Sequence, residues 1–219
     1  MFPSDCLPNR RTFLKAGIGL AAASTALTSL SVAPIATADD EEAWIVGPLP
    51  GYSPQVGTLV SMLAFTRVQV ENNVKGMTQA DLDFLLDAKA NTIGALLLHL
   101  AATDHYFQLN TFGGMKWESW PDDEKKKWDI PMHLGDNARR SIKGHSLDFY
   151  LTQLHEVREK TLTELKKRDD KWLVTLADEG DFKANNYAKW FHVAEHESNH
   201  DGQIKFLKSR LPGAKPASE

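Results

Sequence analysis

Residues 187–211, near the C-terminus, constrain the fold more than any other stretch of the chain. The segment has a single glycine, Gly202, and no proline before Pro212, so little in it interrupts a helix. Its aliphatic residues recur at helical spacing, so the sequence predicts a long helix with one stripe facing a core. That stripe consists of Val193, His196, His200, Ile204, Leu207 and Leu211.

Two histidines, His196 and His200, interrupt this aliphatic stripe one helical turn apart. Side chains at positions i and i+4 lie about 6 Å apart on the same face, so both imidazoles can reach one metal ion. A buried histidine is often structural, with a hydrogen bond to a neighbour. Burying two without partners costs several kcal/mol, and a metal ion would remove that cost. Because two ligands do not complete a site, the pattern requires a further ligand elsewhere in the chain.

The second of three further helical segments contains a candidate for that ligand. These segments cover residues 53–74, about 90–110 and about 146–168. The middle one is too apolar for a surface helix, and His99 lies in the centre of one of its stripes. A lone histidine there would more often be a hydrogen-bonded core residue. Since His196 and His200 need a partner, we predict that His99 is the third ligand.

The connections between the helices complete the fold prediction. Residues 77–89 are expected to form a short helix or turn capped by Thr78. A long connection over residues 115–145 contains three tryptophans, which either line a pocket or belong to the core. These are Trp117, Trp120 and Trp128. Without a clear strand pattern, the sequence predicts an all-α four-helix bundle, in up-down-up-down order, with this long connection between its second and third helices.

The first 38 residues have the pattern of an export signal. Arg10 and Arg11 precede Phe13, Leu14 and Lys15, as in a twin-arginine signal, although Asn9 stands where Ser or Thr is usual. A weakly apolar segment and a small-residue cleavage site follow, so the mature chain is expected to start after residue 38. An uncleaved membrane anchor is the alternative. Twin-arginine export moves folded proteins and suits a cofactor inserted in the cytoplasm, so we expect a periplasmic or otherwise exported protein.

The predicted domain organisation follows from these boundaries. A lead-in linker covers residues 39–52, the bundle covers residues 53–211, and a tail covers residues 212–219. Without residues 1–38 the chain has 22 basic and 28 acidic residues, a net charge of −6, which argues against nucleic acid as the main partner. The only cysteine, Cys6, lies in the signal. A metal site in the mature chain must therefore use histidine, carboxylate or water.

Two motifs resemble those of the DinB-like (damage-inducible, YfiT-like) metal-binding four-helix bundles, over about residues 53–211. The first is Asn91-Thr92-Ile93-Gly94 leading into Leu97-Leu98-His99-Leu100, and the second is His196-Glu197-Ser198-Asn199-His200-Asp201-Gly202-Gln203-Ile204. The resemblance implies three histidine ligands, at His99, His196 and His200. Asp201 stands where family members often have arginine, a change that leaves the ligands intact.

The second motif also matches the H-E-x-x-H of zinc metalloproteases, in which Glu197 would be the general base. The continuation argues against a protease. The only glutamate after His200 is the terminal Glu219, and neither Gln203 nor Phe206 fits the extended form of the motif. We therefore expect Glu197 to support a ligand or to lie on the surface, and treat the metalloprotease as the least favoured hypothesis.

Three more polar residues lie near the predicted ligands along the helices. His192, one turn before His196, is expected at the rim of the pocket or in support of a ligand, rather than as a fourth ligand. Glu195 and Asp104 could orient an imidazole N–H, but solvated carboxylates are the favoured interpretation.

Nitrogen ligands suit a divalent transition metal: zinc is favoured, and nickel, iron or copper are alternatives. The leading hypothesis is an exported metal-dependent hydrolase or transferase acting on a small molecule. Some members of the resembled family look like thiol-dependent transferases, although an exported protein has less access to a cytoplasmic thiol. A non-catalytic metal- or ligand-binding stress protein is the alternative. The expected partner is an unidentified small-molecule substrate, without nucleic acid or a lasting membrane anchor, and a homodimer remains open.

Overall fold

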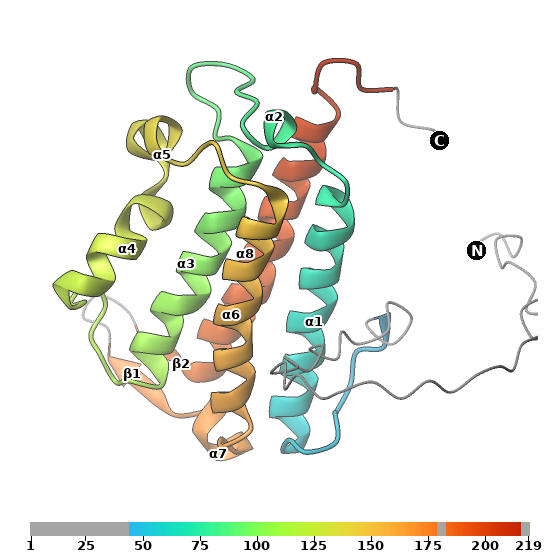
Figure 1. Cartoon of the computed structure of the whole chain (residues 1–219). Coiled ribbons are helices and arrows are strands. Elements are labelled where there is room, and N and C mark those ends of the chain that lie inside the picture. The colour runs from blue at the N-terminus through green and yellow to red at the C-terminus, as the bar shows by residue number, and fades with distance from the viewer. Residues whose placement is uncertain (1–43, 179–182, 216–219) are drawn as a thin grey trace, which may run out of the picture. The chain divides into compact units, whose positions relative to one another are not determined.

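The computed structural model describes residues 44–178 and 183–215 (Figure 1). The predicted export signal, residues 1–38, lies outside the described residues. The described part contains eight helices and one small hairpin. None of these helices combines the length and the apolar composition that crossing a membrane requires.

Four long helices form the body of the fold, which confirms the all-α prediction (Figure 1). Each begins within three residues of its predicted start. They are α1 (Pro54–Val74), α3 (Ile93–Thr111), α6 (Leu147–Leu165) and α8 (Asn186–Lys208).

Side-chain caps set the start of three of these helices. The side chains of Thr92, Ser146 and Asn185 each accept a hydrogen bond from a backbone N–H in the first turn that follows. Such caps satisfy amide groups that have no partner within the helix. They fix where each helix begins, and so which face carries its functional side chains.

The predicted up-down-up-down order is wrong, because α3 and α6 run in the same direction (Figure 1). Asp104 on α3 pairs with Arg158 on α6, and Gln108 further along α3 bonds to Thr161 further along α6. Contacts from Thr66 to Glu197 and from Asn73 to Asp201 show that α1 and α8 are also parallel to each other. The order is therefore up-down-down-up.

The connection between α3 and α6 explains this order. It contains α4 (Asp122–His133) and α5 (Gly135–Ser141), and it returns along the bundle to the end where α3 began (Figure 1). A crossover of this length lets two consecutive long helices run in parallel. The predicted long connection is confirmed, and its charged start, Asp122 to Lys127, is helical.

The remaining elements are short. Helix α2 (Gln79–Leu82) follows the predicted cap Thr78, which forms a reciprocal pair of hydrogen bonds with Asp81. Helix α7 (Asp170–Leu173) precedes an antiparallel hairpin of β1 (Leu176–Asp178) and β2 (Lys183–Asn185). The sequence shows no clear strand pattern here, because three-residue strands are too short to produce an alternating one.

Two clusters of apolar side chains fill the bundle. One surrounds α3 and extends under α4, while the other lies around Trp190 of α8, which is fully buried and packs with residues of α1. The three tryptophans of the long connection divide between the two predicted roles. Trp120 and Trp128 are buried in the first cluster, whereas Trp117 is 36% exposed.

Candidate metal centre

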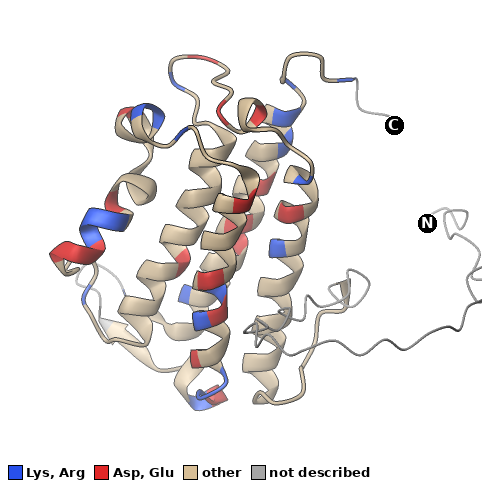
Figure 2. Ribbon diagram, in the orientation of Figure 1, with Lys and Arg blue, Asp and Glu red and all other residues tan. Residues whose placement is uncertain are grey.

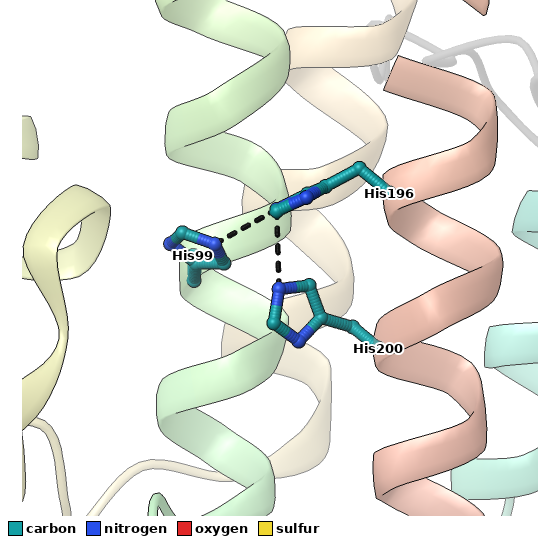
Figure 3. A group of neighbouring side chains, drawn as sticks. All are labelled: His99, His196 and His200. Carbon is teal, nitrogen blue, oxygen red and sulfur yellow. Dashed lines mark hydrogen bonds between the residues drawn. The ribbon is translucent and has the colours of Figure 1, made fainter. Parts of the chain in front are cut away.

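His99, His196 and His200 converge between α3 and α8 (Figure 3). The Nε2 atom of His196 lies 2.9 Å from Nε2 of His99 and 3.1 Å from Nε2 of His200. His99 and His200 are buried and His196 is half-buried. The structure therefore brings together the three residues that the sequence singles out, and they could hold one metal ion.

Close packing of α6 against α3 helps to fix the position of α3, which carries His99. A Cβ atom on Gly94 would lie 2.6 Å from the hydroxyl of Tyr150, so only glycine allows α6 to approach α3 so closely at this point. Helix α3 is antiparallel to α8, as the bonds from Lys189 to Asn110 and from Trp190 to Thr111 show. His99 consequently meets the third and fourth turns of α8, where His196 and His200 lie.

Hydrogen bonds on the far side of two rings fix their tautomers. Nδ1 of His99 lies 3.0 Å from the carbonyl oxygen of Pro131 and must donate to it, because a carbonyl only accepts. Pro131 lies in the last turn of α4, where carbonyl groups lack partners within the helix. Nδ1 of His200 similarly lies 3.1 Å from Oε1 of Gln203. Both rings therefore present an unprotonated Nε2 to the centre.

This donor set fits a transition metal. With Nε2 of His99 and His200 both unprotonated, two lone pairs face His196, which has at most one proton to offer them. A cation at the centre would satisfy all three nitrogens. In a tetrahedral zinc site the nitrogen ligands stand about 3.3 Å apart, close to the two separations observed. Supporting bonds such as those to Pro131 and Gln203 are typical of histidines that bind metals.

The surroundings keep the three imidazoles neutral. Burial, followed by the neighbouring His200, lowers the pKa of His99 to about 4, against the opposing effect of its bond to the Pro131 carbonyl. Burial, followed by His200 and His99, lowers the pKa of His196 to about 3. Burial also lowers the pKa of His200, against the opposing effect of its bond to Gln203. Neutral imidazoles are the form that binds a metal, so protons compete weakly for this site.

These pKa shifts predict that the metal-free protein loses stability in mild acid. The unfolded histidines take up protons below a pH of about 6.5, whereas folded His99 resists protonation until about pH 4. The free energy of unfolding should therefore be constant above pH 6.5 and fall as the pH drops towards 4. Urea titrations in the presence of a chelator would measure this, with His99→Phe expected to flatten the slope. An equal slope in wild type and His99→Phe would contradict the pKa assignment.

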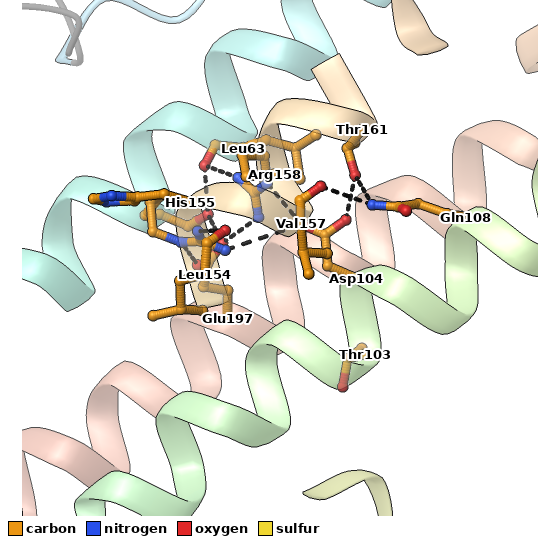
Figure 4. Close-up of polar contacts among 12 residues, drawn as sticks. Leu63, Thr103, Asp104, Gln108, Leu154, His155, Val157, Arg158, Thr161 and Glu197 are labelled. Carbon is orange, nitrogen blue, oxygen red and sulfur yellow. Dashed lines mark hydrogen bonds and ion pairs between the residues drawn. The ribbon is translucent and has the colours of Figure 1, made fainter. Parts of the chain in front are cut away.

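The carboxylate of Glu197 belongs to a buried ion network that joins the four long helices (Figure 4). Glu197 accepts hydrogen bonds from Arg67 of α1, from Arg158 of α6 at 3.0 Å and from Thr66 of α1 at 3.0 Å. Burial would raise the pKa of Glu197, but the two guanidinium groups outweigh burial and hold it below its ordinary value. A carboxylate held in this way is a poor general base, which argues against the protease hypothesis.

Asp104 is the second carboxylate of this network, so the prediction that it is solvated is wrong. It is fully buried, and it accepts hydrogen bonds from Arg158 at 2.7 Å and from Thr161 at 2.5 Å. One charged residue from each long helix thus meets in the core. The sequence offered a clue: Arg67 and Arg158 fall on the apolar stripes of their helices, where a charge needs a buried partner.

His192 and Glu195 are exposed and bond to each other, at 3.1 Å between Nδ1 and the carboxylate. The expectation that Glu195 is solvated is confirmed. Within the described residues, no carboxylate and no fourth histidine joins the group of His99, His196 and His200. The described residues thus supply three histidine ligand atoms to this group.

The family model of the mycothiol-S-transferases matches residues 58–213, which include all four long helices except the first turn of α1. No curated protein matches the chain. The matched region covers well over half of the sequence and contains the three histidines. The chain therefore belongs to the mycothiol-S-transferase family, within the DinB/YfiT-like superfamily.

Proposed function

We propose that this protein is a metal-dependent S-transferase that joins a low-molecular-weight thiol to a small electrophile. The convergence of three imidazoles, whose ligand atoms all lie within 4.8 Å of one another, is the observation that carries the proposal. The family name supports mycothiol, or a thiol of similar chemistry, as the sulfur donor.

In such a reaction a carbon–sulfur bond forms, and the bond from that carbon to the leaving group breaks with its electron pair. The thiol proton passes to solvent. His99, His196 and His200 would hold a divalent transition metal, with zinc favoured by the nitrogen ligands. When bound, such a metal supplies a Lewis acid that lowers the pKa of a water or thiol in its open coordination position.

Backbone and side-chain groups of the chain orient the three histidines. Pro131 and Gln203 hold the rings of His99 and His200 in the tautomer that presents Nε2. The buried network around Glu197 fixes α8 against the other three long helices, directly beside His196. These contacts preorganise the three nitrogens before a metal or a substrate binds.

An activity assay tests this function. Metal-loaded wild type should accelerate conjugation of a low-molecular-weight thiol with 1-chloro-2,4-dinitrobenzene, and a His196→Ala/His200→Ala variant should not exceed the uncatalysed rate. Ser198→Ala, at an exposed position of α8 outside the donor set, is the matched control and should keep the metal-dependent activity. If the metal-loaded protein hydrolyses small esters but transfers no thiol, the hydrolase alternative replaces the transferase.

We also propose that the protein is exported through the twin-arginine pathway and acts in the periplasm or outside the cell. The arginine pair at Arg10 and Arg11, the weakly apolar segment that follows, and the small residues before Asp39 support this. Replacing both arginines with lysine should retain the protein in the cytoplasm, as measured by fractionation and immunoblotting. Unchanged export of that variant would contradict the proposal.

The charge distribution supports a small-molecule substrate over nucleic acid. In Figure 2 basic and acidic residues are scattered over the helices, and α4 carries both signs in its first two turns. A nucleic-acid-binding surface instead gathers basic residues on one face.

A further inference from the structure

A pocket of about 300 Å³ opens beside the candidate metal centre, at the start of α8. His192 connects the two places, because it lines the pocket and its ring centroid lies 5.3 Å from that of His196. The other lining residues come from α3, the start of the long connection, β2 and α8. They are Phe107, Asn110, Trp117, Ala184, Ala188 and Lys189.

Aromatic rings form the walls of this pocket. The ring centroid of Phe107 lies 5.1 Å from that of Trp117 and 5.9 Å from that of His192, with an interplanar angle of 56° in both pairs. Ala184 and Ala188 add only methyl groups, which leaves the space between the rings open. Surfaces of this kind favour a flat apolar group that can contact several rings at once.

The polar groups at the pocket are already engaged within the protein. Nζ of Lys189 donates to Oδ1 of Asn110 at 2.7 Å, and Nδ2 of Asn110 donates to the carbonyl oxygen of Met115 at 2.8 Å. Both residues are buried. Recognition in this pocket therefore depends on apolar contact more than on new hydrogen bonds.

We propose that this pocket binds the planar apolar part of the electrophilic substrate, a group of one or two aromatic rings. The volume is at the lower end of the range for small-molecule pockets, which limits the group to this size. The substrate assignment rests on the proposed function, while the binding of planar apolar groups does not. Electrophiles that carry an aromatic ring would thus be held with the reacting carbon towards His196.

Binding of the neutral fluorescent probe N-phenyl-1-naphthylamine tests the pocket directly. Wild type should bind it, and both Ala188→Phe, which fills the pocket, and Trp117→Ala, which removes a wall, should weaken binding about tenfold. Ser198→Phe places the same ring on an exposed part of α8 and should bind as wild type does. Unchanged binding in both pocket variants, with circular dichroism showing that they are folded, would overturn the proposal.

Two further measurements distinguish a failure of the pocket proposal from a failure of the proposed function. The metal-free His196→Ala/His200→Ala variant should still bind the probe, because the pocket walls do not depend on the donor set. In metal-loaded protein, Ala188→Phe should raise the KM for 1-chloro-2,4-dinitrobenzene about tenfold and leave the KM for iodoacetamide unchanged. Equal effects on both electrophiles would refute the substrate assignment. If the pocket variants lose the probe but the metal-loaded wild type transfers no thiol, the pocket proposal stands and only the proposed function is refuted.

Discussion

Replacing Arg158 with methionine should lower the free energy of unfolding by about 3–5 kcal/mol, the usual cost of removing one partner from a buried ion network. Arg158 donates to Asp104, to Glu197 and to the carbonyl oxygen of Leu63, and all three bonds are buried. Methionine fills a similar volume but donates nothing. Two carboxylates would then remain in the core with fewer donors.

Urea denaturation at pH 7 would measure this loss. The matched control is Lys167→Met, which breaks an exposed ion pair with Glu164 and should change stability by less than about 1 kcal/mol. Because Glu197 neighbours His196, the Arg158 variant should also bind metal more weakly. A variant as stable as wild type would show that the four charges contribute little to the fold.

The second large effect is expected from the metal itself. A ligand that binds only the folded state, present at about 1,000 times its Kd, raises the free energy of unfolding by about 4 kcal/mol. Zinc at that excess should therefore raise the melting temperature of the wild type. It should not raise that of the His196→Ala/His200→Ala variant, in which two of the three converging nitrogens are missing.

His192→Ala is the matched control for this measurement, because His192 lies on the same helix but bonds to Glu195 outside the donor set. Its response to zinc should equal that of the wild type. If His192→Ala abolishes the response while His196→Ala/His200→Ala keeps it, the metal binds elsewhere on α8.

The sequence was sufficient to predict the helices and the three histidines that meet. Both predictions rest on local periodicity: His196 and His200 interrupt an aliphatic stripe, and His99 lies alone in the most apolar helix. Residues on such stripes face the core, so three histidines on two stripes had to lie within it. Whether they also meet depends on the order of the helices, which periodicity does not determine.

The helix order and the ion network show where sequence reasoning failed. A connection of about 35 residues can either cross the bundle or fold back at one end, and composition does not distinguish the two. Aspartate seldom occurs in a core without a partner, so the sequence favours a solvated Asp104. Its partner, Arg158, lies 54 positions away, so only the tertiary structure reveals the pair.

The H-E-x-x-H motif shows how one local pattern can serve two architectures. In both, a helix places two histidines on one face. The intervening glutamate differs: here Arg67 and Arg158 engage it in the core, where it is 1% exposed. The partners of Glu197, more than the motif, therefore distinguish this centre from that of a protease.

Metal content is the measurement that tests the central claim most directly. The chain from Asp39 onward, purified without chelator and examined by native mass spectrometry, should carry about one divalent transition metal ion per molecule, as three histidine ligands require. The His196→Ala/His200→Ala variant, prepared in parallel, should carry none. If the wild type contains no metal and takes none up on reconstitution with zinc, nickel, iron or copper, His99, His196 and His200 form a hydrogen-bonded core cluster, and the proposed transferase is refuted.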